Sequence, residues 1–558
     1  MQRLSRLALL LAACHRPADA IQSTAAASTG DTTIPPDTSA STSNGTALPT
    51  SDATEATATS TTSTTGSTTE DIGTGDTGTT GDPVGLRYDA VRQKSAHNSF
   101  QRDETLLDQI VFHRVRSLEL DIHHSSSKSP TIAGEWYVYH IDIADDASHC
   151  RRLSQCLAQI AAAAQALPEH EVITLWIDLK DPFVAEHQPA DLDALLTKAF
   201  GERLLTPADL RAACPAATNL REAVTFPGCS WPELAASHGR VIVTLTGGGL
   251  ADPASKLSTY VGADASARAA FAAPDLDDPA DLDASPAIFH NLALADAGLA
   301  TAVRSAGLVS RVWVADDADA WATAEAAGVH HIASNKVNAA IDPWATTASP
   351  GGYPFTCIDG CTTPDTEAGA VLRATVDSGD LWADSDDALL ATWTPDGDVT
   401  LTALLAVPSS HIEPFAKACL IARESAAPGA PYLAVCRPTD EQPLRVQLRE
   451  TAGADSEAIE LADIDGLSSE TPAFARLERT GACVRGLTSI DGMQWTELGA
   501  HCFPAPLPLV GLTASSHDAG EVRVLFVAPT ASPGGALAAG TLTVTPVGQA
   551  KGSVADGL

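Results

Sequence analysis

The chain has 558 residues, which is enough for two or three domains with a large core. Its 34 basic and 70 acidic residues give a formal net charge of −36. Surfaces that bind nucleic acid need clustered Lys and Arg, so this charge argues against nucleic acid as a partner. It argues equally against broad electrostatic docking to an anionic membrane.

Residues 1–13 are predicted to be an export signal. Two arginines precede an apolar run at 7–13 that is far too short to span a bilayer. The Leu-Ala-Ala-Cys sequence at 11–14 resembles the lipobox of bacterial lipoproteins. That resemblance implies lipidation of Cys14, a membrane anchor and, with His15 following, sorting to the outer membrane or cell surface. An ordinary signal peptide with a chance cysteine is the alternative.

A disordered linker is predicted over residues 14–83. From residue 22 onward the segment consists mainly of Ser, Thr, Gly, Asp and Ala and has almost no large apolar side chain. Such a composition cannot bury enough surface to offset the entropy lost on ordering. We expect the linker to hold the folded part of the chain away from the membrane.

Residues 84–345 alternate between strand and helix patterns. Helical periodicity is found at 151–166 and 316–327, for example. Eight strands separated by helices predict a parallel α/β barrel of the TIM type. The expected strands are 91–97, 117–123, 136–141, 171–179, 240–246, 286–290, 310–316 and 329–334.

The second half of the chain changes character after a predicted linker at 346–375. Apolar residues alternate with polar ones in short segments between turn residues, which predicts an antiparallel β-sandwich over 376–530. The S-I-D-G-M-Q-W sequence at 489–495 resembles a hairpin of concanavalin-like modules, and this implies either a carbohydrate ligand or a structural accessory domain. The Gly- and Ala-rich end at 531–558 is predicted to be a flexible tail.

The cysteines indicate disulfides. Setting Cys14 aside leaves an even number in sequence-local pairs, and export favours oxidation, so we expect nearest neighbours to bond. Six helical residues rise about 9 Å, too far for a disulfide within one straight helix. Cys150 is therefore expected in the loop before the helix that contains Cys156. A zinc site at Cys357 and Cys361 is the alternative, although no second ligand pair is evident.

Polar side chains gather where predicted strands end. On strand 117–123 the leucines alternate with Glu119 and Asp121, and in an α/β barrel the acids then face inward. Two carboxylates on one face of a strand repel each other unless a positive charge lies between them. On the strand at 171–179 and the residue after it, Asp178 and Lys180 share a face in the same way.

Two histidines complete the predicted site. His97 and Asn98 close the first strand, and His140 ends another. Oxygen donors without a soft ligand select a hard cation, Ca²⁺ or alternatively Mg²⁺. Histidines beside such a cation suit acid–base catalysis near neutral pH, and Lys180 could hold a phosphate oxygen. Together these residues predict a site that cleaves a phosphodiester.

The ordered motifs resemble the calcium-dependent phosphoinositide-specific phospholipase C family, especially its secreted bacterial branch, over roughly residues 88–340. They are H-N-S at 97–99, E-L-D at 119–121, Y-H at 139–140 and I-D-L-K at 177–180. The resemblance implies calcium-assisted cleavage of phosphatidylinositol or a related inositol phosphodiester, with attack by the inositol 2-hydroxyl.

The resemblance also implies roles for individual residues. His97 would act as base or transition-state stabiliser, and His140 would protonate the departing alcohol. Lys180 and Arg311 would contact the phosphate or head group, although a structural ion pair is an equal alternative for Arg311. The implied calcium ligands are Asn98, Glu119, Asp121 and Asp178.

Two departures from the family pattern bear on this expectation. Asp178 is one methylene shorter than the Glu common at its position and could ligate through water. The sequence Ser-Asn-Lys at 334–336 also differs, which puts the head group more in doubt than the reaction. The alternatives are a glycerophosphodiester-type phosphodiesterase, whose H-R-G opening the chain lacks, and a non-catalytic lipoprotein that binds surface glycans or lipids.

Overall fold

The computed structural model describes residues 85–339, 341–346, 354–358, 371–377, 379–407, 415–438, 444–460, 474–517 and 520–557. The predicted export signal, Cys14 and the linker at 14–83 lie outside this part of the chain. Within it, no helix combines the length and the apolar character that crossing a membrane requires.

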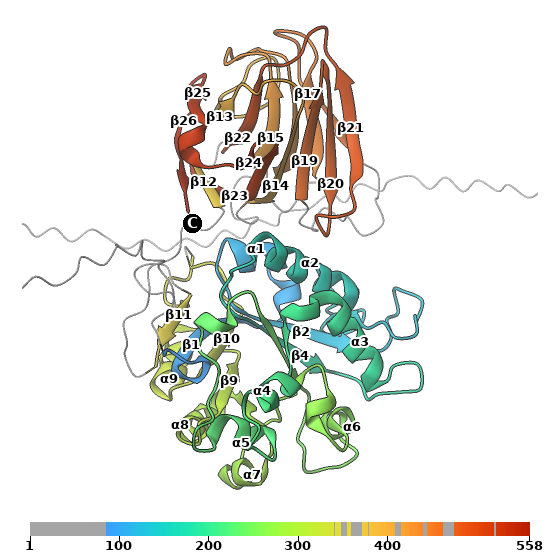
Figure 1. Ribbon diagram of the computed structural model, residues 1–558, viewed down its shortest axis with the longest axis vertical. Coiled ribbons are helices and arrows are strands. Elements are labelled where there is room, and N and C mark those ends of the chain that lie inside the picture. The colour runs from blue at the N-terminus through green and yellow to red at the C-terminus, as the bar shows by residue number, and fades with distance from the viewer. Residues whose placement is uncertain are drawn as a thin grey trace, which may run out of the picture. The chain divides into compact units, whose positions relative to one another are not determined.

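A curled parallel sheet surrounded by helices forms the first half of the chain (Figure 1). Neighbouring strands pair in the order β5, β6, β4, β2, β1, β10, β9 and β8, with β7 on β6. An isolated parallel bridge between Asp275 and Asn291 links the residues after β7 to β8. This arrangement confirms the predicted TIM-like barrel.

The elements of this half have the following bounds. The strands are β1 (Val91–Ala96), β2 (Ser117–His123), β3 (Tyr137–Val138), β4 (Ile173–Leu179), β5 (Leu204–Leu205), β6 (Val241–Thr246), β7 (Phe271–Ala272), β8 (Phe289–Ala293), β9 (Val309–Trp313), β10 (His331–Ser334) and β11 (Phe355–Cys357). The helices are α1 (Leu106–Val111), α2 (Leu153–Ala166), α3 (Pro189–Phe200), α4 (Pro207–Ala213), α5 (Leu220–Thr225), α6 (Lys256–Val261), α7 (Pro279–Ala284), α8 (Ala300–Ser305) and α9 (Ala318–Ala326).

The barrel strand predicted at 136–141 is wrong. Only Tyr137 and Val138 extend along β2, and they pair with it in the antiparallel direction. The sheet contains two parallel strands that were not predicted, β5 and β7, which both pair with β6. Each has two residues and is too short to show an alternating pattern in sequence.

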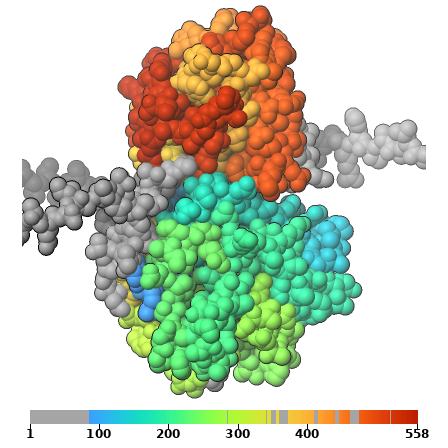
Figure 2. All heavy atoms as spheres, viewed as in Figure 1, coloured from blue at the N-terminus to red at the C-terminus, as the bar shows by residue number. Residues whose placement is uncertain are grey.

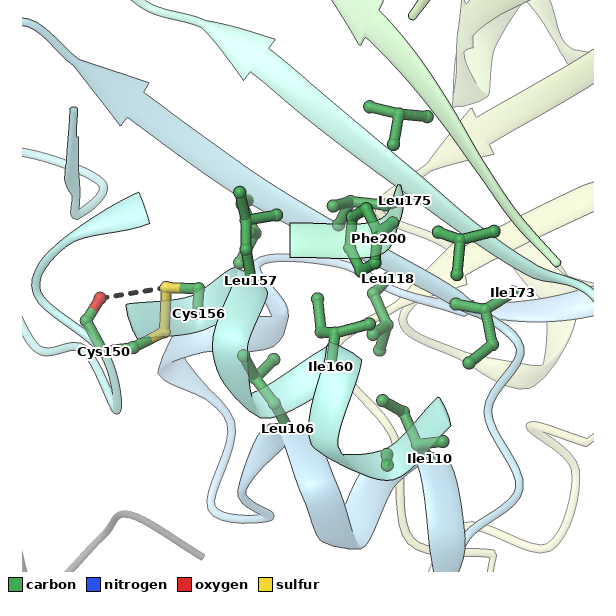
Figure 3. Close-up of a cluster of buried hydrophobic side chains, with 14 of the residues drawn as sticks. Leu106, Ile110, Leu118, Cys150, Cys156, Leu157, Ile160, Ile173, Leu175 and Phe200 are labelled. Atoms are coloured by element: carbon green, nitrogen blue, oxygen red, sulfur yellow. Dashed lines mark hydrogen bonds between the residues drawn. A yellow bond between two sulfur atoms is a disulfide. The ribbon is translucent and has the colours of Figure 1, made fainter. Parts of the chain in front are cut away.

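Period-2 alternation on β2 and β4 divides core from site. Leu118 of β2 and Ile173 and Leu175 of β4 point toward the helical layer, where they meet Leu157 and Ile160 of α2 (Figure 3). Full burial of each such side chain stabilises the fold by about 1.5–3 kcal/mol. In Figure 2 the atoms of this half, coloured from blue to yellow-green, cover the sheet from view. The polar residues of these strands therefore face the barrel interior.

The second half is the predicted antiparallel β-sandwich. One sheet pairs β21, β20, β19, β14, β23, β12 and β26 in that order, and the other pairs β18, β17, β16, β15, β22, β13 and β25. The strands are β12 (Val371–Asp377), β13 (Ala388–Trp393), β14 (Val399–Ala406), β15 (Lys417–Arg423), β16 (Tyr432–Pro438), β17 (Arg445–Arg449), β18 (Glu457–Glu460), β19 (Phe474–Thr480), β20 (Cys483–Ser489), β21 (Thr496–Cys502), β22 (Leu509–Ser515), β23 (Glu521–Ser532), β24 (Gly535–Ala536), β25 (Thr543–Val547) and β26 (Lys551–Asp556).

The predicted flexible tail at 531–558 is wrong as well. Strand β25 pairs with β13 and β26 with β12, so this end of the chain adds a strand to each sheet. The T-V-T-P-V sequence of β25 alternates like an edge strand, but the surrounding Gly and Ala obscured that pattern. The sandwich also begins earlier than predicted, because β12 starts at Val371.

Four of the expected nearest-neighbour disulfides are present, and the fifth pair includes Cys361, which lies outside the described residues. Cys150 lies in the loop before α2, as predicted, and bonds to Cys156 inside the helix (Figure 3). The described pairs are Cys150–Cys156, Cys214–Cys229, Cys419–Cys436 and Cys483–Cys502.

Candidate active site

The register of β2 against β4 brings two predicted acids together. Asp121 is the direct neighbour of Asp178, and both carboxylates lie on the inner face of the sheet. The ammonium of Lys180 lies between them, with its Nζ 3.0 Å from Asp121 Oδ2 and 2.6 Å from Asp178 Oδ2. The three residues that the sequence placed on one face therefore form one charged cluster.

The electrostatics of this cluster are asymmetric. Burial, together with the nearby carboxylates of Glu119 and Asp178, raises the pKa of Asp121 to about 8 although Lys180 opposes the shift. Burial alone would lower the pKa of Lys180, but the two aspartates outweigh it and raise that pKa above its ordinary value. Loss of the proton from Asp121 therefore carries a cost that one ammonium does not remove.

Glu119 has a different cation. Arg311 Nη2 lies 2.6 Å from Glu119 Oε2, and the backbone N–H of Asn98 donates to the same oxygen at 3.0 Å. Arg311 Nη1 also donates to Asn291 Oδ1 at 3.0 Å. Burial would raise the pKa of Glu119, but Arg311 and the neighbouring His97 lower it below the ordinary value. Of the two roles considered for Arg311, the structure contains the ion pair.

His97 is oriented by residues from the last barrel strands. Its Nδ1 lies 3.1 Å from Asn335 Oδ1, while Asn335 Nδ2 donates to Asp316 Oδ2 at 2.5 Å. The carboxylate of Asp316 only accepts, so Asn335 must turn its amide nitrogen toward it and its oxygen toward His97. His97 Nδ1 is then the donor, and Nε2 keeps a free lone pair 3.9 Å from Glu119 Oε2.

The charge state of His97 follows from its surroundings. Burial lowers the pKa of His97, and the opposing Glu119 does not restore it. The imidazole is therefore neutral near pH 7, with Nε2 available to accept a proton. The indole of Trp313 is stacked 6.4 Å from the imidazole and is itself 38% exposed, so this side of the site reaches solvent.

His140 lies at the exposed edge of the site. Its Nδ1 is 2.8 Å from Asp145 Oδ2, and the two side chains are 37% and 49% exposed. Gln101, in the short 3-10 helix that follows Asn98, donates to Asp145 Oδ1 at 2.9 Å. This contact ties the His140 loop to the segment that carries His97 and Asn98. Asn98 has a left-handed backbone, with φ of 47°, and is buried.

Sequence reasoning missed four polar residues that support the site. Asn335 and Asp316 orient His97, whereas Asn291 and Asp275 support Arg311, because Asn291 Nδ2 donates to Asp275 Oδ1 at 2.8 Å. All four lie in or just after the later barrel strands, and that position was the available signal. The remaining histidines have other contacts. His123 and His124, at the end of β2, both contact Asp181. His330 and His331 are buried at the start of β10.

The donor set fits a hard divalent cation chemically. No three His, Cys, Asp or Glu side chains in the described part of the chain form a metal-binding group as they stand. Two oxygens already meet at one cation position, however, because the Lys180 ammonium contacts both aspartates. Asp121 Oδ1 is buried and has no hydrogen-bond partner among the described residues. All these donors are oxygens, which calcium prefers.

A family model supplies the comparison that bears on this geometry. The model described as "Phosphoinositide phospholipase C, Ca2+-dependent" matches residues 133–273. The match indicates an enzyme, and the matched part of the barrel is similar to phospholipase C-like phosphodiesterases. The match confirms the resemblance to calcium-dependent phosphoinositide-specific phospholipase C, a family that depends on Ca²⁺.

Several solved structures are similar to the barrel. A calcium-dependent phosphoinositol-specific phospholipase C from Pseudomonas is 23% identical, over 49% of this chain and 95% of that chain, with a TM-score of 0.41. A phosphatidylinositol-specific phospholipase C from Streptomyces antibioticus is 19% identical, over 45% and 95% of the two chains, with a TM-score of 0.38. A glycerophosphodiester phosphodiesterase from Parabacteroides distasonis is 12% identical, over 47% and 98%, with a TM-score of 0.27. No curated protein matches the chain.

Proposed function

We propose that the chain cleaves phosphatidylinositol, or a related inositol phosphodiester, with the help of calcium. The observation that carries this proposal is the orientation of His97. Asn335 and Asp316 fix its Nδ1 as the donor, and its free Nε2 lies beside the acid cluster. A neutral imidazole with one free nitrogen next to a cation-binding group is suited to general base catalysis.

The reaction divides between the two histidines. His97 Nε2 takes the proton of the inositol 2-hydroxyl, whose oxygen forms the new bond to phosphorus as the bond to the glycerol oxygen breaks. His140 has its Nδ1 on Asp145, so its exposed Nε2 donates the proton to the leaving alcohol. Lys180 stabilises a non-bridging phosphate oxygen as a point charge. Bound at the aspartate oxygens, calcium would neutralise the charge that develops on the phosphate.

The test is release of inositol phosphate from vesicles of phosphatidylinositol in phosphatidylcholine, with CaCl₂ and with a calcium chelator. His97→Ala and His140→Ala are each expected to lower the rate by about 10²–10⁴-fold, because a proton transfer is lost. His501→Ala, in β21 of the sandwich, is the matched control and is expected to keep the full rate. Equal rates with calcium and chelator would remove the metal from the mechanism. Re-adding Mg²⁺ in place of Ca²⁺ tests the alternative cation.

The same assay separates the other enzyme class and the non-catalytic alternative. Attack by the 2-hydroxyl predicts a cyclic inositol phosphate as first product. Faster turnover of glycerophosphoinositol or glycerophosphocholine would favour a glycerophosphodiester-type enzyme instead. Binding to vesicles without turnover of any of these substrates would favour a surface-binding lipoprotein.

Two further parts of the proposal concern partners. We propose a lipid anchor at Cys14, which Cys14→Ser should abolish when membrane fractions are compared. A carbohydrate ligand at the 489–495 hairpin is less well supported, because the Arg476 guanidinium lies 3.7 Å from the centre of the Trp495 ring and covers one face. A glycan array with the full chain and Trp495→Ala tests it, and equal binding by both would leave the hairpin a structural role.

A further inference from the structure

We propose that Lys180 is a built-in counter-ion of the acid cluster, and that a divalent cation must displace its ammonium before the site can work. The inference rests on the proposed function, because it assigns the calcium position to the oxygens of Asp121 and Asp178. The inference adds that Lys180 has two alternative partners, which are the two aspartates and the substrate phosphate.

The geometry makes the two cations mutually exclusive at the Oδ2 oxygens of the two aspartates. Lys180 Nζ lies 3.0 Å from Asp121 Oδ2 and 2.6 Å from Asp178 Oδ2, so it already uses an oxygen of each acid. Calcium binds carboxylate oxygens at about 2.3–2.6 Å, almost the same separation. A calcium ion held by both oxygens would fall nearly on the ammonium nitrogen. The ammonium must therefore leave when calcium enters.

The exchange takes place next to solvent. The side chains of Lys180 and Asp178 are 28% and 22% exposed, whereas that of Asp121 is 1% exposed, so the ammonium joins a buried acid to a partly exposed one. The backbone around Lys180 is fixed, because its N–H donates to Ile122 O and Lys256 Nζ donates to Leu179 O and Lys180 O. Displacement therefore requires only the flexible four-carbon stem to move.

Arg311 cannot make the same exchange. Its side chain is 1% exposed, and the guanidinium contacts Glu119, Asn291 and the face of Trp176 at once. A guanidinium held on several sides is a permanent partner, whereas an ammonium held by two carboxylates at the solvent edge is exchangeable. Of the two cations in the cluster, we infer that Lys180 alone is released.

Release has a consequence for the reaction. The freed ammonium remains tethered at the end of β4, within reach of a phosphate that approaches the cation, and it can then take a non-bridging oxygen. Loading of the metal and binding of the phosphate thereby become coupled steps. Without a divalent cation, the ammonium stays on the aspartates and cannot serve the substrate.

The direct test is amine labelling of the wild-type full chain with acetic anhydride, with CaCl₂ alone and with chelator, read by mass spectrometry. Lys180 is expected to be acetylated at least severalfold faster in calcium, because its ammonium has left two carboxylates. Lys198, an exposed lysine of α3, is the control and should react equally in both. Labelling of Lys180 that is unchanged or slower in calcium would overturn the proposal.

A second test measures calcium binding by calorimetry, without any substrate. Lys180→Met is expected to bind calcium at least tenfold more tightly than wild type, while Lys198→Met stays within twofold. In chelator Lys180→Met should unfold at a lower temperature than wild type, and calcium should close that gap. Weaker or equal calcium binding would contradict the proposal. If Lys180→Met does not fold, Lys180→Gln takes its place.

These readouts are independent of the proposed chemistry. Failure to release inositol phosphate, combined with faster labelling of Lys180 in calcium, would overturn the substrate and keep the exchange. Normal calcium-dependent cleavage with unchanged labelling of Lys180 would keep the substrate and overturn the exchange.

Discussion

Two buried charge clusters, one in the sandwich and one in the barrel, are balanced in different ways. In the sandwich, the Asp386 carboxylate accepts from Arg423 and Arg449, and all three side chains are fully buried. Each guanidinium also donates to backbone carbonyls, for example those of Ala427 and Ala383. The cluster carries one net positive charge, and carbonyl oxygens surround it.

The barrel cluster has the opposite balance. Three carboxylates, from Glu119, Asp121 and Asp178, share the guanidinium of Arg311 and the ammonium of Lys180. When all three are ionised, one net negative charge remains, and Asp121 Oδ1 has no hydrogen-bond partner in the described part of the chain. The comparison shows how a stabilising cluster differs from a functional one. The first leaves no donor or acceptor open, whereas the second lacks one positive charge that a ligand can supply.

The largest expected effect follows from a substitution that breaks the sandwich cluster. Asp386→Ala should lower the free energy of unfolding by about 3–5 kcal/mol, because it leaves two guanidiniums buried without an anion. Urea unfolding measures this, and Glu497→Ala, an exposed carboxylate of β21, is the control. Cleavage per folded molecule should not change. A loss below about 1 kcal/mol, the range of exposed ion pairs, would contradict the comparison.

A paired carboxylate within the barrel, Glu171 with Arg114 and Arg116, provides a second contrast with the acid cluster, through opposite pH dependences. Burial would raise the pKa of Glu171, but Arg116 and Arg114 lower it to about 2, so its stabilising contribution is present above the ordinary carboxyl pKa and is lost as pH falls toward 2. That contribution is about 3 kcal/mol. Asp121, with its pKa raised to about 8, contributes below its ordinary pKa near 4, and the contribution is lost as pH rises to about 8.

The measurement is urea unfolding in chelator at pH values from about 3 to 8.5, comparing wild type with Glu171→Gln and with Asp121→Asn. The advantage of wild type over Glu171→Gln should shrink toward acid. Relative to Asp121→Asn, wild type should lose stability toward alkaline pH. Two slopes of the same sign would show that the paired Glu171 and the acid cluster around Asp121 do not differ as described.

The inner face of the site could be predicted from the sequence because its information is local. Glu119 and Asp121 alternate with leucines on one strand, and Asp178 and Lys180 do so on and just after another. Alternation alone decides which way these side chains point. The barrel and the sandwich were predicted from the same kind of pattern. The predicted strands were wrong where a real strand is too short to alternate, as in β7, or where Gly and Ala hide the alternation, as around β25.

The supporting residues could not be predicted in this way. His97 and Asn335 are 238 residues apart in sequence, and they meet only because β1 and β10 are neighbours in the sheet. Arg311 reaches Glu119 from β9, a strand three places away from β2 along the sheet path. Strand order is a tertiary property, so periodicity in a single sequence does not contain it.

The acid cluster around Asp121 is expected to serve function rather than stability. Asp121→Asn should lower cleavage by about 10²–10³-fold, because a charge that helps to stabilise the transition state is lost. The free energy of unfolding at pH 7 should stay the same or rise, since the amide cannot ionise beside two other carboxylates. Asp277→Asn, an exposed acid, is the control. Loss of stability with unchanged cleavage would instead make this cluster structural, like that of Asp386.

The smallest expected effect concerns the residue that orients His97. Asn335→Ala should lower kcat by about tenfold to a hundredfold with little change in KM, because the imidazole loses the acceptor that fixes Nδ1 as the donor. Asp316→Asn should have a weaker effect of the same kind, since it acts through Asn335. The split between kcat and KM and the pH–rate profile distinguish loss of orientation from loss of binding. If both variants cleave at the wild-type rate, the backbone bond from His97 N–H to Ser334 O is sufficient to place the imidazole.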